Sequence, residues 1–330
     1  MEGSILITGA NGSLAIPMVD QVLRLHPNLT ALLTVRDTED ANSQKLRETV
    51  SQYPNAKVLI SKLDLANLLA VQDFATKLAQ SISDQTQPPL YAIIANAFYW
   101  NLIHDPEITV DGYDKTLQVS HIAHVSLILR LLGSFGPKGG RVVLFSSDAH
   151  WPGKNGLEKY PPEIPQDLDK LVKPQGGEDK FGLGFQQYAC TKLAIVTWMY
   201  ALNTHLQMDP KLQHITTVAI NPGNLLDSRA LSKRTPKSVQ YMQRFVLRPL
   251  MPLVRLLLDP FARSVNAAAV DIIDLAVSDK YAGSSGYYTL LSKDESAPES
   301  REEEKQKALW TASLKWAHID KTDTVLSSGL

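Results

Sequence analysis

Cysteine is nearly absent from this sequence of 330 residues, which contains one, Cys190. A single thiol excludes an internal disulfide and a zinc site built from thiolates, and it fits the reducing cytosol, so we expect a cytoplasmic protein. An excess of either charge is also lacking, because 33 lysines and arginines balance 34 aspartates and glutamates, for a formal net charge of −1. This balance argues against a general nucleic-acid-binding protein.

Long apolar runs are missing as well. The most apolar stretch, 246–258, is interrupted by Arg248, Pro249, Pro252 and Arg255, and it is shorter than the ~20 residues that a membrane-spanning helix needs. The first residues contain no basic segment followed by an apolar core, so we expect neither a signal peptide nor a transmembrane segment. Peripheral contact of 246–258 with a membrane surface is left open.

What is present is a regular alternation of short apolar runs with amphipathic segments of helical length. The apolar runs are rich in Val, Ile and Leu on consecutive positions, which is typical of strands buried on both faces. We expect strands at 4–8, 31–35, 57–62, 91–96, 141–146 and 216–220, and a weaker one at 287–290. Helices are expected at 14–25, 44–53, 71–81, 113–133 and 186–207. This order predicts a doubly wound α/β fold, with a parallel sheet of about seven strands and helices on both faces.

Three segments interrupt this alternation, and we interpret them as additions to a single domain that spans 1–330. Residues 151–184 are rich in Pro, Gly and Lys, and they predict an inserted loop. Residues 224–264 contain apolar helical pieces and predict a lid, and residues 299–330 predict a helical tail. Loops that project from a rigid sheet determine substrate choice in many α/β enzymes, so the insertion and the lid are expected to wall a substrate site.

The first predicted strand runs into a glycine-containing turn at 8–15 and then into a helix. Gly9 allows the tight turn, small side chains let the backbone approach a pyrophosphate, and the amino end of the helix favours negative charge. The turn therefore predicts a dinucleotide site. The residues expected to contact the dinucleotide here are Gly9, Asn11, Gly12, Ser13 and Leu14.

Arg36 and Asp37 follow the second predicted strand, at the place that faces the adenosine ribose in a doubly wound sheet. An acidic residue there binds the ribose 2′-hydroxyl, whereas an arginine pairs with a 2′-phosphate. Because Arg36 comes first, the sequence favours NADP(H) over NAD(H), and Asp37 leaves NAD(H) open. Asp64 and Leu65 follow the third strand, where the adenine amino group would need an acceptor.

A tyrosine and a lysine four residues apart mark the last long helix. Tyr188 and Lys192 share one helix face, and a neighbouring ammonium lowers the pKa of a phenol toward the range useful for proton transfer. Ser146 and Ser147 lie at the carboxyl end of the fifth strand. Together with the glycine turn, these residues predict an acid–base site beside a bound dinucleotide.

In the order of these motifs the sequence resembles the short-chain dehydrogenase/reductase family over nearly the whole chain. The segments 111–121 and 308–313 are similar to the retinol-dehydrogenase-like branch of that family and its fungal relatives. The resemblance implies a Rossmann-type fold. It is carried by the glycine turn, Asp64, the segment 95–97, the fifth strand with Ser147, the Tyr188/Lys192 pair and the segment 221–223.

The resemblance also implies a role for each matching residue. Tyr188 would give its proton to the substrate oxygen in reduction, Lys192 would lower the pKa of Tyr188 and bind the nicotinamide ribose, and Ser147 would hold the carbonyl. We choose Ser147 over Ser146, because the family's serine is usually the second of such a pair. The cofactor contacts implied elsewhere are Leu14, Arg36, Asp64, Leu65, Asn96, Pro222 and Gly223.

Three departures from the family pattern bear on the mechanism. Ser120 stands where the helix asparagine of the family's proton relay is expected, and it enters the predicted catalytic set at that position. Phe98 replaces a glycine after the fourth strand, and Asp227 replaces a threonine after 221–223. We expect slower or rerouted proton delivery through Ser120, with hydride transfer itself retained.

Two histidines on a predicted helix, His121 and His124, are three residues apart, a spacing that could serve a metal. Further ligand types are not found nearby in the sequence, so we expect structural roles for both and no metal. The mouth of the site is predicted just past Ser147 and just past 221–223. The residues expected to line the substrate there are His150, Trp151, Asn224 and Leu225.

We therefore predict an NADP(H)-dependent oxidoreductase that interconverts a carbonyl and a secondary alcohol. The apolar content of the lid favours a bulky hydrophobic substrate, and the similarity to fungal relatives is consistent with specialised metabolism. Two alternatives are left open: a non-redox catalyst on the same fold (an epimerase, dehydratase or cyclase), and a non-catalytic NADP(H)-binding protein. Family members often pair through the helices expected at 113–133 and 186–207, which leaves both a homodimer and a monomer open.

Overall fold

The computed structural model describes residues 2–257, 259–327 and 329, and is built around an eight-stranded sheet in the order β10-β9-β6-β5-β4-β1-β2-β3. Neighbouring strands pair in parallel, except β10, which pairs antiparallel with β9. The strands are β1 (Gly3–Thr8), β2 (Leu29–Val35), β3 (Val58–Lys62), β4 (Leu90–Ala95), β5 (Gly140–Phe145), β6 (Ile215–Asn221), β9 (Gly286–Thr289) and β10 (Ser292–Lys293). The predicted doubly wound fold is confirmed, and the short β10 is the strand beyond the predicted seven.

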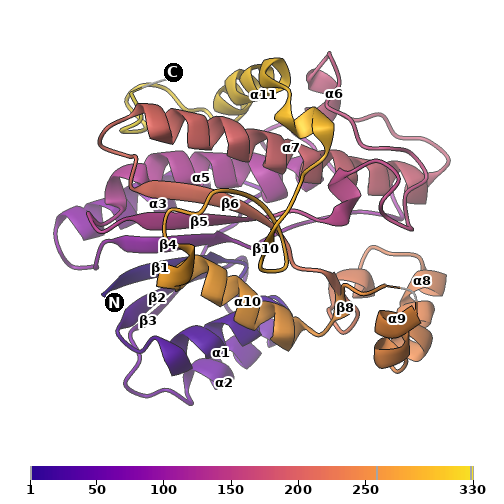
Figure 1. Ribbon diagram of the computed structural model, residues 1–330, viewed down its shortest axis with the longest axis horizontal. Helices are drawn as coiled ribbons and strands as arrows, with labels where there is room; N and C mark the ends of the chain where they lie inside the picture. Colours follow the sequence, from indigo (N-terminus) through magenta and orange to yellow (C-terminus); the bar gives the residue numbers. More distant parts are fainter. Residues whose placement is uncertain (1, 258, 328, 330) are drawn as a thin grey trace.

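Helices cover both faces of the sheet (Figure 1). One face carries α1 (Ala15–Leu25), α2 (Ala41–Val50) and α10 (Val265–Val277), and the other carries α3 (Leu68–Ser83), α5 (Ala123–Leu131) and α7 (Lys180–Met208). Every residue of β1, β2 and β6 is buried, which explains why their apolar positions run consecutively instead of alternating. Outside α7 lies α11 (Glu303–Trp316), where Trp310 stacks on Trp198 with ring centroids 5.9 Å apart.

The order of the strands fixes where a ligand can enter. The chain leaves β1 toward β2 on one side and later returns to β4 on the other side of β1. Loops on either side of such a switch point diverge, so a crevice opens at the carboxyl ends of the strands. The glycine turn after β1 and the segments after β4, β5 and β6 all end at this edge.

Two predicted helices differ from the observed ones. The helix expected at 113–133 consists of α4 (Lys115–Leu117), a π-helical turn η1 (Gln118–Ile122) and α5. The helix expected at 186–207 is α7, which begins earlier, at Lys180, because the side chain of Asp179 accepts a hydrogen bond from Gly182 N and caps it. The first turns of α7 and the short α6 (Asp169–Val172) thus lie inside the predicted insertion 151–184.

The predicted lid, 224–264, protrudes from the helical layers. It contains β7 (Asn224–Leu225), α8 (Lys237–Met242), a π-helical turn η5 (Gln243–Leu247), α9 (Met251–Leu257) and β8 (Ala262–Arg263). In Figure 1, α8 and α9 stand apart from the sheet at the lower right. Residue 258 of the lid, and residues 328 and 330 of the predicted tail 299–330, lie outside the described residues.

Candidate active site

A cavity of about 1070 Å³ opens at the carboxyl ends of the parallel strands and continues under the lid. Its lining includes every predicted cofactor and substrate residue, together with Ser147, Tyr188 and Lys192. Ser120, the remaining member of the predicted catalytic set, does not line it. The structure therefore brings into one cavity residues that are distributed from β1 to the lid.

The glycine turn forms the floor of the cavity at the end of β1. Gly9 has φ +61°, and a Cβ atom built on it would lie 3.0 Å from the Cβ of Ala97, so the backbone leaves no room for a side chain. The Asn96 amide donates to the carbonyl oxygens of Thr8 (2.9 Å) and Gly9 (3.3 Å) and ties the turn to β4. A tight turn that ends at the amino end of α1 fits a pyrophosphate.

The end of β2 separates the two candidate determinants of cofactor choice. Arg36 lines the cavity, whereas Asp37 does not, and the Asp37 carboxylate accepts a hydrogen bond from Glu39 N at 2.9 Å. Asp40 also lines the cavity, but its carboxylate caps α2 by accepting from Asn42 N and Ser43 N. Among the residues that the structure describes, no carboxylate pairs with Arg36.

Arg229, a lid residue that sequence reasoning missed, lies against the glycine turn. Its guanidinium donates to Asn11 O at 2.7 Å and to the Asn42 side chain, and its backbone N–H donates to Ser13 Oγ at 3.0 Å. A second guanidinium thus stands at the phosphate-facing end of the cavity. The only signal for Arg229 in the sequence was that it follows closely after the segment 221–223. That signal does not predict a contact between Arg229 and the glycine turn at the start of the chain.

The predicted catalytic side chains meet where α7 passes the end of β5. Tyr188 is hydrogen-bonded to Ser147, whose single hydroxyl proton is donated to Asp148 Oδ1 at 2.8 Å. Burial raises the pKa of Tyr188 above its ordinary value, and the hydrogen bond with Ser147 opposes this shift. The Nζ of Lys192 donates to Phe145 O at 2.7 Å, and burial lowers its pKa to about 7.

The expected lowering of the Tyr188 pKa by Lys192 is therefore not found. The Nζ of Lys192 lies 5.5 Å from the centroid of the Tyr188 ring and is directed at the β5 backbone. Desolvation outweighs the remaining effects on the phenol. In this structure Tyr188 holds its proton firmly.

The chain is similar in sequence to several known proteins. A family model described as the AcuH dehydrogenase domain matches residues 229–326. The chain is 28% identical to the short-chain dehydrogenase iccH of Talaromyces variabilis, with 99% of each chain covered. It is 40% identical to the dehydrogenase acuH of Aspergillus aculeatus over 82 residues, which are 25% of this chain and 83% of that one. It is 26% identical to human retinol dehydrogenase 13, over 96% of this chain and 85% of that one.

The chain belongs to the short-chain dehydrogenase/reductase family of oxidoreductases. The predicted resemblance to the retinol-dehydrogenase-like branch and to fungal members is confirmed. Among solved structures, the NADPH-bound carbonyl reductase from chicken fatty liver matches with a TM-score of 0.56 at 18% identity, over 89% of this chain and 99% of that one. This likeness confirms the Rossmann-type fold.

In this short-chain dehydrogenase the residue at the relay position is turned away from the cavity. Ser120 lies in the π-helical turn η1, is buried, and accepts a hydrogen bond on its Oγ from Tyr99 N at 3.2 Å. Its carbonyl bonds the Nδ1 of His124 at 3.1 Å. Because the hydroxyl is occupied by the segment after β4, the structure does not bring Ser120 into the catalytic group.

His150 lines the cavity but offers no free nitrogen. Its Nδ1 lies 2.6 Å from Ser147 O, and its Nε2 lies 3.0 Å from the backbone N–H of Ala297, so the bonds assign a neutral ring with the proton on Nδ1. Burial lowers the pKa of His150 to about 4. The ring therefore positions the loop after β5 and can meet a substrate through its carbon atoms only.

The two histidines of the predicted metal spacing point to different neighbours. The Nε2 of His124 bonds Thr8 Oγ1 at 2.9 Å, and the Nε2 of His121 bonds Ser313 Oγ at 2.9 Å. Within the described part of the chain, no group of three or more potential metal ligands comes together. Through these bonds His124 joins α5 to β1, and His121 joins the π-helical turn η1 to α11.

Aromatic side chains enclose Tyr188, and most of them were not singled out from the sequence. Ring centroids of Trp100, Phe185 and Phe98 lie 5.2, 5.8 and 6.4 Å from that of Tyr188. Phe98 occupies the family's glycine position, and its ring centroid lies 5.8 Å from the Nζ of Lys192. The signal that could have indicated this wall is the aromatic run 98–100 directly after the fourth strand.

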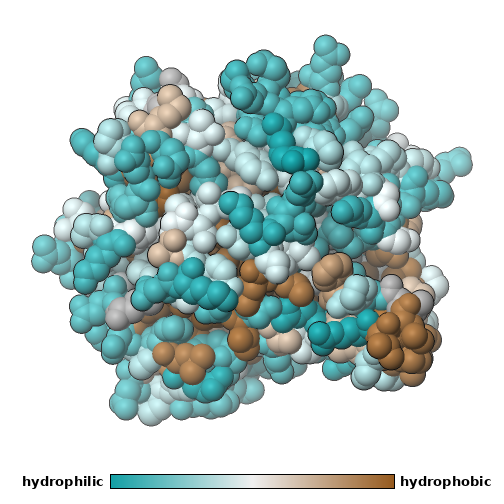
Figure 2. Space-filling model, viewed as in Figure 1, coloured by the Kyte–Doolittle hydropathy of each residue, from teal (hydrophilic) through white to brown (hydrophobic). Residues whose placement is uncertain are grey.

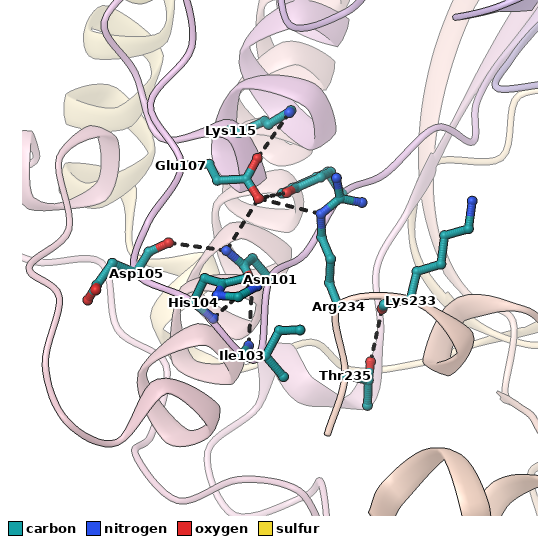
Figure 3. Close-up of polar contacts among 10 residues, drawn as sticks. Asn101, Ile103, His104, Asp105, Glu107, Lys115, Lys233, Arg234 and Thr235 are labelled. Atoms are coloured by element: carbon teal, nitrogen blue, oxygen red, sulfur yellow. Dashed lines mark hydrogen bonds and ion pairs between the residues drawn. The ribbon is translucent and has the colours of Figure 1, made fainter. Parts of the chain in front are cut away.

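A polar cluster fastens the lid to the segment after β4 (Figure 3). The Glu107 carboxylate accepts from Lys115 Nζ at 3.1 Å and from the Tyr99 hydroxyl, and it lies 3.4 Å from Arg234 Nε of the lid. The carbonyl of Arg234 also accepts from Leu102 N at 2.8 Å. We call Tyr99, Glu107, Lys115 and Arg234 the Glu107 cluster, of which Tyr99 and Lys115 line the cavity.

Proposed function

We propose that this chain is an NADP(H)-dependent oxidoreductase that interconverts a carbonyl and a secondary alcohol on a bulky hydrophobic small molecule. One observation carries the proposal: a single cavity runs from Arg36, past the glycine turn, to Ser147 and Tyr188. A nicotinamide dinucleotide bound there would supply or accept the hydride. The protein then has to position the substrate and move one proton.

The charges at the adenosine end support NADP(H) over NAD(H). Arg36 faces the cavity, whereas the carboxylates of Asp37 and Asp40 are occupied by backbone N–H groups. A free guanidinium suits a 2′-phosphate, and a carboxylate available for a ribose 2′-hydroxyl would have favoured NAD(H). The carbonyl reductase of the same fold is NADPH-bound, which agrees with this choice.

The state of the catalytic groups supports reduction as the favoured direction. The buried Tyr188 phenol retains its proton at neutral pH and is ready to donate it to a substrate oxygen. Ser147, hydrogen-bonded to Tyr188, would hold the same oxygen and stabilise the negative charge that develops on it. Lys192, with a pKa of about 7, would carry a positive charge below neutrality, and its helical position one turn from Tyr188 suits binding of the nicotinamide ribose.

The walls near Tyr188 support a lipophilic and aromatic substrate. Phe98, Trp100, Phe185 and Trp151 line the cavity on the side of the reacting group. Flat apolar molecules gain from burial against such rings and from edge-to-face contacts with them. The fungal sources of the relatives are consistent with a substrate from specialised metabolism.

The test combines purified protein, NADPH and a panel of hydrophobic ketones, and follows absorbance of the reduced cofactor. We expect consumption with at least one aromatic ketone, abolished in Tyr188→Phe while NADPH affinity is kept, because only the proton donor is removed. Consumption that survives in Tyr188→Phe would contradict the assignment of the acid. Binding of NADPH without consumption on any ketone would favour a non-catalytic binding protein or a non-redox catalyst.

One observation favours the second candidate, a non-redox catalyst such as an epimerase, dehydratase or cyclase. The Phe98 ring stands beside Lys192 and Tyr188, where the family has a glycine. If this ring restricts the space at Tyr188, replacing it with the family's residue should create or increase NADPH consumption. We expect Phe98→Gly to alter the range of ketones and not to switch the reaction on.

A further inference from the structure

The lid helices α8, η5 and α9 have an inner side that lines the cavity and an outer side that is exposed. Their inner side lines the cavity with Val239, Met242, Leu247 and Val254. Their outer side exposes large apolar side chains, which Figure 2 shows as a compact brown group at the lower right, where Figure 1 places α9. The fractional exposures are 61% for Tyr241, 61% for Phe245, 50% for Leu253, 78% for Leu256 and 67% for Leu257. We call these five residues the outer lid face.

The outer lid face is organised and not a scatter of single residues. Tyr241 and Phe245 lie one helical turn apart, with rings stacked at 5.9 Å between centroids. Leu253, Leu256 and Leu257 follow the three- and four-residue spacing that places side chains on one side of a helix. Scattered apolar residues on a surface need no explanation, but the apolar group over α9 is compact in Figure 2, and a group of this kind marks an interaction surface.

The lid segment that carries this apolar group also carries positive charge. Arg244, Arg248 and Arg255 are exposed and, within the residues that the structure describes, none of them has a carboxylate partner. The Arg244 guanidinium lies over the Phe245 ring, 5.4 Å from its centroid. Residues 229–263 contain eight lysines and arginines and one aspartate, although the whole chain has a net charge of −1. The excess of positive charge is thus concentrated in the segment that carries the apolar group.

We infer that the outer lid face docks the protein on an anionic lipid bilayer surface. Short amphipathic helices with aromatic and leucine side chains bordered by arginine lie in the plane of the membrane interface. Anionic headgroups would pair with the free guanidinium groups while the apolar side chains enter the acyl boundary. A second copy of the chain is disfavoured as the occupant, because it would bring the same arginines face to face.

The mode of contact is peripheral. No helix within residues 2–257, 259–327 and 329 is long and apolar enough to span a bilayer. The seven residues of α9 reach only the interfacial depth. The stretch 246–258, for which peripheral contact was left open from the sequence, accordingly forms the centre of the contact as far as it is described.

The test is flotation of the full-length protein with vesicles of phosphatidylcholine alone or mixed with phosphatidylserine. We expect the protein to float with the mixed vesicles only, and to be released by salt. The triple variant Arg244→Gln/Arg248→Gln/Arg255→Gln should lower the partition coefficient on the order of 100-fold, roughly fivefold per arginine. A triple variant of exposed lysines elsewhere, Lys45→Gln/Lys57→Gln/Lys77→Gln, is the matched control and should float like the wild type.

The apolar component has its own variant. Phe245→Ser/Leu256→Ser removes side chains that do not line the cavity, and it should abolish flotation even at low salt. Val110→Ser, which alters a side chain 82% exposed elsewhere, is the control. Thermal melting checks that each variant folds, and if the apolar variant does not fold, the arginine triple decides alone.

Three results would overturn the inference. The first is absence of flotation with mixed vesicles, and the second is equal flotation of wild type and arginine triple. The third is a dimer, detected by light scattering in solution, that Phe245→Ser/Leu256→Ser converts to a monomer. That result would assign the outer lid face to a second copy of the chain.

Discussion

The dinucleotide end of the sheet and the lid are built on different principles. At the dinucleotide end, β1 and β2 are buried at every position and joined by a continuous parallel ladder. In the lid helices α8, η5 and α9, burial is confined to Gln243 and Val254. The lid is fastened by polar ties such as Arg229 to Asn11 O (2.7 Å) and by the Glu107 cluster.

This difference assigns different tasks to the two regions. Chemistry needs atoms held to within a fraction of an ångström, which a buried sheet edge provides at low entropic cost on binding. Admission of a bulky substrate needs a wall that can open, and regions with few buried contacts open most easily. Substitutions at the sheet edge should therefore change kcat, whereas substitutions in the lid should change KM.

Ser147→Ala should show the largest effect on the sheet side. Loss of a donor aimed at the developing oxyanion is expected to lower kcat by about 10³-fold, near 4 kcal/mol, with NADPH affinity unchanged. Ser146→Ala is the matched control, because the Ser146 hydroxyl is directed at Ser147 O at 3.5 Å, and it should lose far less. Steady-state kinetics decide, and equal losses in both variants would remove the distinction between the serines.

Buried histidines should make the sheet side sensitive to acid. Burial lowers the pKa of His124 to about 4 and that of His150 to about 4, compared with about 6.5 in the unfolded chain. Between pH 6.5 and 4 the unfolded state binds protons that the folded state does not, so the free energy of unfolding falls as the pH falls. The loss should approach ~3 kcal/mol for each histidine by pH 4 and be absent above pH 7.

Urea unfolding at several pH values measures how steeply the free energy of unfolding changes with pH. His124→Gln should flatten this dependence, although the variant is less stable at pH 7. The exposed His318→Gln should leave it unchanged. A free energy of unfolding that is constant between pH 7 and pH 4.5 would contradict the buried, neutral state of these rings.

The dinucleotide end could be predicted from the sequence in more detail than the lid, for a physical reason. The strands, the turn around Gly9 and the Tyr188/Lys192 spacing are local patterns whose meaning depends on a few adjacent residues. Arg229 and the Glu107 cluster depend on contacts between segments distant in the chain, as in the bond from Arg229 to Asn11. Such pairings follow from the folded geometry and leave no periodicity in the sequence.

The same distinction explains where the structure departs from the predicted catalytic group. The position of Ser120 follows the family's order, but the π-helical turn η1 directs its hydroxyl to Tyr99 N. The helical spacing of Lys192 and Tyr188 is as predicted, yet the bond of Lys192 to Phe145 O and the desolvation of the phenol determine their pKa values. Burial is a property of the packed molecule, and neighbours in sequence do not report it.

Arg36→Ala tests the cofactor preference at the rigid end. Removal of a guanidinium that pairs with a phosphate should weaken NADPH binding by ~1.5–3 kcal/mol, a roughly 10- to 100-fold rise in Kd. NADH has no 2′-phosphate, so its Kd should hardly change. Arg24→Ala, an exposed arginine bonded to Gln21, is the control for both cofactors. Equal losses for NADPH and NADH would remove the argument for the phosphate.

The smallest effect is expected from variants of the Glu107 cluster. These variants test most directly whether the lid affects KM and the sheet edge affects kcat. Arg234→Met removes a half-exposed ion pair of the kind that contributes at most about 1 kcal/mol, so KM should rise roughly fivefold with kcat kept. Glu107→Gln weakens the same contact together with the pair to Lys115, and because the two variants share the Arg234 contact, their effects should add only in part in the double variant. Lys307→Met, which breaks an exposed pair with Glu304 at 3.2 Å, should change neither constant. A parallel fall of kcat in Arg234→Met would show that the lid also positions the reacting groups, and the two regions would then have to be treated as one catalytic unit.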